Sequence, residues 1–198
     1  MPRVINVVDH DPTWSAAFEQ EAVALAGVFG RRLLRIHHIG STSISGICAK
    51  PIVDILIVLD QTGTINSFNT AMEALGYRPR GECLDATVPG TPGRFYFSKD
   101  RNGTRTHQVH VCADGHPEIA DKLAFRDYVR AHPVEAAAYG ELKQRLALAH
   151  SDDNIGYMLG KDAFVKSLLA AARLWYVSSE ALSSESHCSG SGSSDRDA

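Results

Sequence analysis

The chain has 198 residues, of which 44% are hydrophobic and 22% charged, and its formal net charge is −3. This composition is typical of a soluble globular domain that is long enough to bury a core. The small negative charge argues against a general polyanion-binding surface and gives no strong nucleic-acid signature, but it is compatible with a local basic pocket. The four cysteines form no CxxC pair, no signal peptide is visible, and no apolar run could cross a bilayer. We therefore expect a cytoplasmic protein without a membrane partner.

The first half of the chain is predicted to be rich in β-strands. A helix begins after Asp11-Pro12, where an N-cap precedes a proline, and another is expected over residues 64–75. An Asn-Gly step at residues 102–103 indicates an antiparallel hairpin, preceded by a Gly/Pro-rich loop over 81–93. Strands are expected at residues 4–8, 33–39, 52–59, 94–98 and 106–112.

The second half is predicted to be helical from Pro117 onward. The His132-Pro133 step interrupts the first helix, because a residue before proline disfavours helical geometry. A second helix runs to about His150, and a third follows Ser151-Asp152. The predicted fold class is therefore α+β: one domain over residues 1–177, with a mixed β-sheet, helices packed against it and a helical C-terminal half. Residues 178–198 are rich in Ser, Gly and Asp and are expected to form a disordered tail.

The most informative segment is a Gly-Ser turn that closely precedes a very apolar strand. Gly40 allows a close backbone approach, and the hydroxyl groups and amides of Ser41, Thr42 and Ser43 could bind a phosphate group. Asp54 lies within the following apolar strand, where a charge is costly unless a cation or several donors satisfy it. We expect Asp54 to be a catalytic residue and a metal ligand. The alternatives are a structural ion pair of Asp54 with Lys50 or an arginine, and a plain turn at Gly40-Ser41.

Further candidates come from the histidines and the basic residues. His107 and His110 lie three apart on a predicted strand and therefore point to opposite faces of the sheet. His110 shares its face with Gln108 and is the better catalytic candidate. A structural role for His110 is an equal alternative. Tyr157 and Lys161 are four apart on a predicted helix, so they share a face and could close a binding site together. The residues expected to bind a phosphate or carboxylate group, each of which could also be a solvated charge, are Lys50, Arg94, Arg126, Lys143 and Lys161.

Taken together, these motifs resemble the GrpB family over about residues 3–170. The resemblance rests on several motifs in one order: residues 38–43 (HIGSTS), Gly46, 49–55 (AKPIVDI), 94–95 (RF), 107–111 (HQVHV), 123–130 (LAFRDYVR), and Tyr157, Gly160, Lys161 and Phe164. This family is similar in fold to the nucleotidyltransferase superfamily, and relatives occur fused to dephospho-CoA kinase. The resemblance therefore implies a nucleotidyltransferase-like fold.

One departure from the superfamily pattern bears on the activity. The superfamily pairs the Gly-Ser turn with two carboxylates one residue apart and a third on a later strand, and these hold two metal ions. Here Asp54 matches the first position, Leu56 stands at the second, and the later strand offers His110. Mg²⁺ prefers oxygen ligands, so the loss of two carboxylates weakens such a site and leaves Mg²⁺, another divalent cation or no ion as alternatives.

Three functions are compatible with these residues. The chain could transfer a nucleotidyl group to a small acceptor, with Gly40 and Ser41 holding phosphates and Asp54 a metal. It could instead be a non-catalytic module that binds a nucleotide, a coenzyme or another phosphorylated small molecule at a degenerate metal site. In a third interpretation, the polar motif only stabilises a turn. The sequence identifies neither the acceptor nor the oligomeric state.

Overall fold

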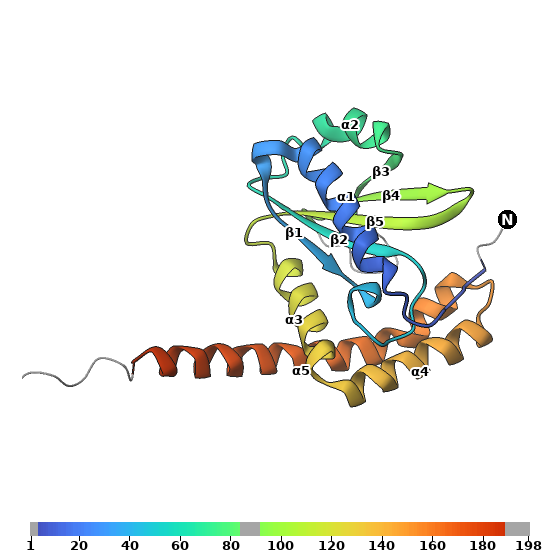
Figure 1. Ribbon diagram of the computed structural model, residues 1–198, viewed down its shortest axis with the longest axis vertical. Helices are drawn as coiled ribbons and strands as arrows, with labels where there is room; N and C mark the ends of the chain where they lie inside the picture. Colours follow the sequence, from blue (N-terminus) through green and yellow to red (C-terminus); the bar gives the residue numbers. More distant parts are fainter. Residues whose placement is uncertain (1–3, 84–91, 189–198) are drawn as a thin grey trace, which may run out of the picture.

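The computed structural model describes residues 4–83 and 92–188, whose strands form one mixed five-stranded sheet (Figure 1). The strand order is β1-β2-β5-β4-β3, with β2 and β5 parallel and the other neighbouring pairs antiparallel. The strands are β1 (Leu33–Ile39), β2 (Val53–Leu59), β3 (Tyr77–Glu82), β4 (Phe95–Arg101) and β5 (Thr104–Ala113). The position of β2 between β1 and β5 explains why its sequence is so apolar.

Helices cover the two faces of this sheet unequally. Helices α1 (Thr13–Phe29) and α2 (Asn69–Ala74) pack on one face, where alternate residues of β2 and β5 form the largest hydrophobic core with Leu25, Phe29 and Met72. On the opposite face, Ile119 of α3 (Pro117–Ala131) packs with Leu56, Val58 and Cys112. Because side chains alternate along β2, Asp54 points to this second face, with Leu56 and Val58.

The C-terminal helices form a second layer attached to the sheet through α3. Figure 1 shows α4 (Pro133–Ala149) and α5 (Asn154–Cys188) side by side below the sheet, with α5 running on beyond the body. A second core joins them to α3 and to the segment between β1 and β2; its buried members include Ile44, Ile47, Tyr128, Val129, Tyr139 and Leu168. Within the part of the chain that the structure describes, no helix is both long and apolar enough to span a membrane.

Several predictions made from the sequence are confirmed. The fold class is α+β with a mixed sheet, helices against it and a helical C-terminal half. The β4–β5 hairpin turns at Asn102 and Gly103, whose φ angles are +51° and +78°, as a tight hairpin with an Asn-Gly turn requires. Helix α3 ends at Ala131 and α4 begins at Pro133, so the His132-Pro133 step separates two helices as expected.

The structure differs from the boundaries expected from the sequence at four places. Residues 4–8 form no strand, only an isolated bridge between Val8 and Ala49, and residues 65–68 are a 3-10 turn ahead of the short α2. Strand β3 occupies residues 77–82, at the start of the predicted loop, because its backbone pairs with β4 despite Pro79 and Gly81. The rest of that loop over 84–91 lies outside the described residues. Helix α5 extends to Cys188, past residue 177 where the sequence places the end of the domain, and residues 189–198 are not described.

Candidate functional site

A group of polar side chains occupies the face of the sheet that α3 only partly covers. The strand register places Gln108 beside Asp54, His110 beside Leu56, and Ser98 and Tyr96 of β4 beside those two β5 residues. Neighbouring residues of a sheet that lie in register point to the same side. We call this group (Asp54, Tyr96, Ser98, Gln108 and His110) the polar sheet face.

The Gly-Ser turn lies directly against Asp54. Ile39, the last residue of β1, pairs with Asp54, so Gly40 begins the turn beside the carboxylate. Gly40 has a φ of +69°, and a Cβ atom at this position would lie 2.4 Å from Asp54 Oδ2 and 3.0 Å from Asp54 Cβ. Only glycine fits both this conformation and this approach. The structure therefore brings the two halves of the predicted motif into contact.

Two hydroxyl groups of the turn are occupied within the fold. Thr42 Oγ1 donates its one hydrogen to the Ile52 carbonyl (3.1 Å). In the 3.0 Å contact between Thr42 Oγ1 and His38 Nε2, the histidine N–H is therefore the donor and the hydroxyl oxygen the acceptor. Burial, followed by the charges of Arg130 and Arg126, lowers the pKa of His38 to about 4, so its ring is neutral. Ser43 Oγ donates to the Gly40 carbonyl (2.7 Å). Ser41 is half-buried, and among the described residues its hydroxyl has no hydrogen-bond partner, which leaves it available to a ligand.

Lys50, Tyr157 and Lys161 meet as one group next to Asp54. Lys50 Nζ lies 4.0 Å from the centroid of the Tyr157 ring and donates to Asn154 Oδ1 (3.0 Å), while Lys161 Nζ lies 5.4 Å from the same centroid. Burial lowers the pKa of Lys50 to about 8; Lys161 lowers it further and Asp54 opposes the shift. The first two turns of α5 thus bring Tyr157 and Lys161 to the loop before β2, which confirms that the two residues share a face.

The environment of Asp54 is electropositive. Burial raises the pKa of Asp54 to about 6, against the opposing effects of Lys122, Lys161 and Lys50, in that order. Lys122 had not been recognised from the sequence. It lies on α3 between Ile119 and Leu123, both of which pack on this face of the sheet, and that spacing is the signal that could have revealed it. Its ammonium group lies 3.1 Å from Glu118, which also binds Arg94 at 3.2 Å.

His110 lies on the polar sheet face and is neutral. Burial lowers its pKa well below the usual value, and the charges of Lys122 and Arg94 act in the same direction. Its ring packs on Tyr96 at a centroid distance of 5.4 Å, and its buried Nδ1 has no hydrogen-bond partner among the described residues. His107 faces α1 instead, 3.8 Å from Glu21, as the predicted alternation of faces requires.

The donor set does not fit a metal site built from protein ligands alone. Within residues 4–83 and 92–188, no three His, Cys, Asp or Glu side chains converge in a way that could hold a metal ion. Asp54 therefore brings one carboxylate to a position surrounded by ammonium groups. A hard divalent cation usually needs several oxygen ligands, and Leu56 supplies none.

Arg126 and Lys143 use their charged groups within the fold. Arg126 donates to both carboxylate oxygens of Asp127 (2.7 and 2.9 Å) and to the His38 carbonyl (3.1 Å), which ties α3 to the end of β1. Lys143 is fully buried, donates to the Cys48 carbonyl and lies 4.4 Å from the centroid of the Tyr139 ring. Burial lowers the pKa of Lys143 to about 8. Both residues support the loop that carries the turn and are not grouped around Asp54.

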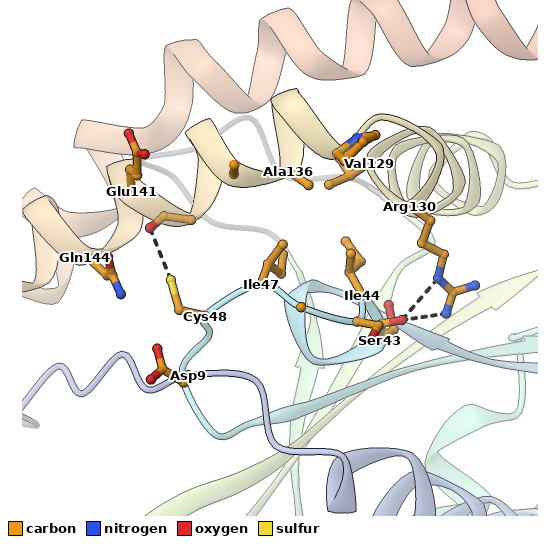
Figure 2. A pocket seen from close by; sticks show the side chains of 15 residues that line it. Asp9, Ser43, Ile44, Ile47, Cys48, Val129, Arg130, Ala136, Glu141 and Gln144 are labelled. Atoms are coloured by element: carbon orange, nitrogen blue, oxygen red, sulfur yellow. Dashed lines mark hydrogen bonds between the residues drawn. The ribbon is translucent and has the colours of Figure 1, made fainter.

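A cavity of about 720 Å³ lies between residues 43–48 and helices α3 and α4. Figure 2 shows Arg130 at one end, donating to the Ser43 carbonyl (3.1 and 2.6 Å), and Asp9, Glu141 and Gln144 toward the other. Between these ends lie the apolar side chains of Ile44, Ile47, Val129 and Ala136. Of the predicted site residues only Ser43 lines this cavity, which is therefore a feature distinct from the polar sheet face.

The sequence and structure define a member of a known family. The family model described as GrpB protein matches residues 4–171, and the chain belongs to the GrpB family. The crystal structure of the conserved protein GrpB from Enterococcus faecalis is similar, with 38% sequence identity and a TM-score of 0.79. That match covers 86% of this chain and 99% of the E. faecalis chain.

Other relatives are longer than this chain. The UPF0157 protein YqkA of Bacillus subtilis is 41% identical over 173 residues, which cover 87% of this chain and 48% of YqkA. A dephospho-CoA kinase of Mycolicibacterium paratuberculosis is 27% identical, with 86% of this chain and 46% of the kinase covered. The chain thus spans about half the length of these two proteins. The chain also has a weak structural similarity to a cytoplasmic RNA terminal U-transferase, with 14% sequence identity and a TM-score of 0.41.

The contact between Gly40 and Asp54 predicts that Gly40→Ala is much more damaging than the same change at Gly46. Both glycines have a positive φ (+69° and +80°), but a Cβ at Gly46 would meet nothing within 4 Å. Gly46→Ala should lose about 1 kcal/mol of unfolding free energy through its backbone conformation alone. Gly40→Ala should lose at least about 2 kcal/mol more, because Asp54 must shift. Urea denaturation measures both variants, and equal losses would show that the contact is not constraining.

The buried Lys143 predicts a characteristic pH dependence of stability. Its pKa is lower in the folded than in the unfolded chain, so the unfolded state binds more protons between pH 8 and 10.5. The free energy of unfolding of the wild type, measured relative to Lys143→Met, should therefore rise by up to about 3 kcal/mol across this range. Denaturation at several pH values, with exposed Lys166→Met as the control, tests this. A flat difference would mean that the Lys143 ammonium is well solvated.

Proposed function

We propose that the polar sheet face and the adjoining Gly-Ser turn bind a nucleotide or another phosphorylated small molecule. The observation that carries the proposal is a group of lysines on this side of the sheet. Lys50 and Lys161 lie over the same Tyr157 ring, and Lys122 lies between Ile119 and Leu123 on the helix that packs against Leu56. Ammonium groups on partly buried side chains attract phosphate strongly, because water screens them less than surface charges. The glycine conformation at residue 40 and the unpartnered hydroxyl of Ser41 add backbone and side-chain donors beside them.

A coenzyme is one candidate within this ligand class. The similar protein from M. paratuberculosis carries the name dephospho-CoA kinase, and dephospho-CoA contains both a nucleotide and a diphosphate. This relationship supports dephospho-CoA as a probe alongside ATP and CTP. The binding role itself rests on the residues around Asp54 and does not depend on which of these ligands is bound.

Transfer of a nucleotidyl group is the second candidate function, and one observation favours it. With a pKa of about 6, Asp54 could accept the proton of an acceptor hydroxyl group near neutral pH. The hydroxyl oxygen would then attack the α-phosphorus and pyrophosphate would leave. A divalent cation at Asp54 stays a prediction, and it would have to take its other ligands from the nucleotide because the described side chains supply too few.

Replacing Asp54 by asparagine separates these roles. The pKa of Asp54 is raised in the folded state, so its ionisation destabilises the fold above pH 6 and has no such effect below about pH 4. Asp54→Asn should therefore increase the free energy of unfolding at pH 7 by on the order of 2 kcal/mol, and the gain should vanish toward pH 4. Calorimetric titration with ATP should show affinity maintained or raised several-fold, because a negative charge is removed. Any transferase activity should be lost.

Asp60→Asn provides the matched control, because Asp60 follows the same strand but is exposed and paired with Arg32. It should change neither stability at pH 7 nor ATP affinity appreciably. If Asp54→Asn instead unfolds the protein, Asp54 is a structural member of an ion pair and the binding proposal is wrong. If neither ATP, CTP nor dephospho-CoA binds the wild type, the proposal also fails.

A further inference from the structure

The three lysines around Asp54 come from three separate elements of the fold. Lys50 precedes β2, Lys122 lies in α3 and Lys161 in α5. These elements meet only in the folded chain, so the cluster is not a charge run of the sequence. Lys50 and Lys161 lie over the same Tyr157 ring, and Lys122 lies between Ile119 and Leu123, which pack on the face of the sheet that carries Asp54. The positive charges of all three also oppose the raised pKa of Asp54.

Contacts within the fold hold each ammonium group in place. Lys50 is fixed by its bond to Asn154 (3.0 Å) and by the Tyr157 ring, which it shares with Lys161. Lys122 is fixed by Glu118 at 3.1 Å. Side chains that are already ordered lose little conformational entropy when a ligand arrives, which favours binding. Lys122 and Lys50 are half-buried, so their charges are less screened than those of surface lysines.

The balance of charge at this site favours an anion over a cation. Three ammonium groups surround one carboxylate, and the second and third positions of the superfamily's metal-binding trio hold Leu56 and the neutral His110. Glu118, the other acid close to Lys122, also binds Arg94. A divalent cation brought to this group would be repelled by the four positive charges of Lys50, Lys122, Lys161 and Arg94 and attracted by the two negative charges of Asp54 and Glu118. The negatively charged oxygens of a phosphate group would instead be attracted by the net positive charge of the group.

We infer that Lys50, Lys122 and Lys161 take the place of the metal ions, so that the site binds the phosphate groups of its ligand as the free, metal-free anion. Lys122, which the sequence did not single out, is the phosphate-binding residue that α3 contributes. The inference rests on the proposed function and adds to it the form of ligand that is bound. It also assigns to side chains the neutralisation of charge that metal ions usually provide for nucleoside triphosphates.

Calorimetric titration of the full chain with ATP tests the inference, once in EDTA and once with excess MgCl₂. The wild type should bind ATP in EDTA, and Mg²⁺ should weaken the affinity several-fold, because the ion neutralises the phosphates before they reach the lysines. Lys122→Gln should weaken binding in EDTA about tenfold or more, and Lys122→Arg should retain most of the affinity. Lys166→Gln, on the exposed side of α5 and paired with Asp162, should alter affinity less than twofold.

The outcomes separate the inference from the proposed function. If ATP, CTP or dephospho-CoA binds only when Mg²⁺ is present, the inference is overturned and the proposed binding function stands. If none of them binds under either condition, both fail together. If Lys122→Gln stays folded by circular dichroism and binds as well as Lys166→Gln does, Lys122 is not part of the site and the three-lysine assignment is wrong.

Discussion

The close approach of Gly40 to the Asp54 carboxylate is the contact on which the rest of the candidate site depends. It follows from strand pairing: Ile39 lies opposite Asp54, so the chain must turn directly over the carboxylate when β1 ends. A residue with a Cβ would need the space that Asp54 fills. The polar bonds of Thr42 and Ser43 then fix the turn, and Arg130 binds its Ser43 carbonyl from α3. The carboxylate, the turn and the supporting helix are therefore positioned together.

The polar residues around this contact oppose the stability of the domain. Burial raises the pKa of Asp54 and lowers that of Lys50, so each group would be more easily ionised in the unfolded chain. Mutual attraction compensates only in part, because Asp54 has three lysines near it and no bidentate partner among the described residues. A fold selected only for stability would place apolar residues at these positions. The retention of charge here is the pattern expected of a binding site.

The sequence predicted what depends on short-range pattern and missed what depends on tertiary packing. Gly40 and Asp54 could be recognised because a phosphate-type turn precedes a carboxylate in an apolar strand, and Tyr157 and Lys161 because a helix places residues four apart on one face. Lys122 was missed: its spacing from Ile119 and Leu123 places it beside the buried side of α3, but only the docking of α3 on the sheet shows which polar residues that side faces. Likewise, the hydroxyl groups of Thr42 and Ser43 looked free in the sequence, but the fold uses both.

Leu56 is part of the apolar packing between α3 and the sheet. Its side chain is fully buried beneath α3, in contact with Ile119, Cys112 and Val58. A carboxylate there would lie in an apolar environment, at a cost of several kcal/mol unless a metal ion or a donor compensated it. The packing of α3 over Leu56 also brings Lys122 to this face of the sheet, so the helix that buries Leu56 supplies a positive charge near Asp54. Leu56 and Lys122, which the sequence does not connect, are thus linked by the same helix: α3 buries the first and positions the second.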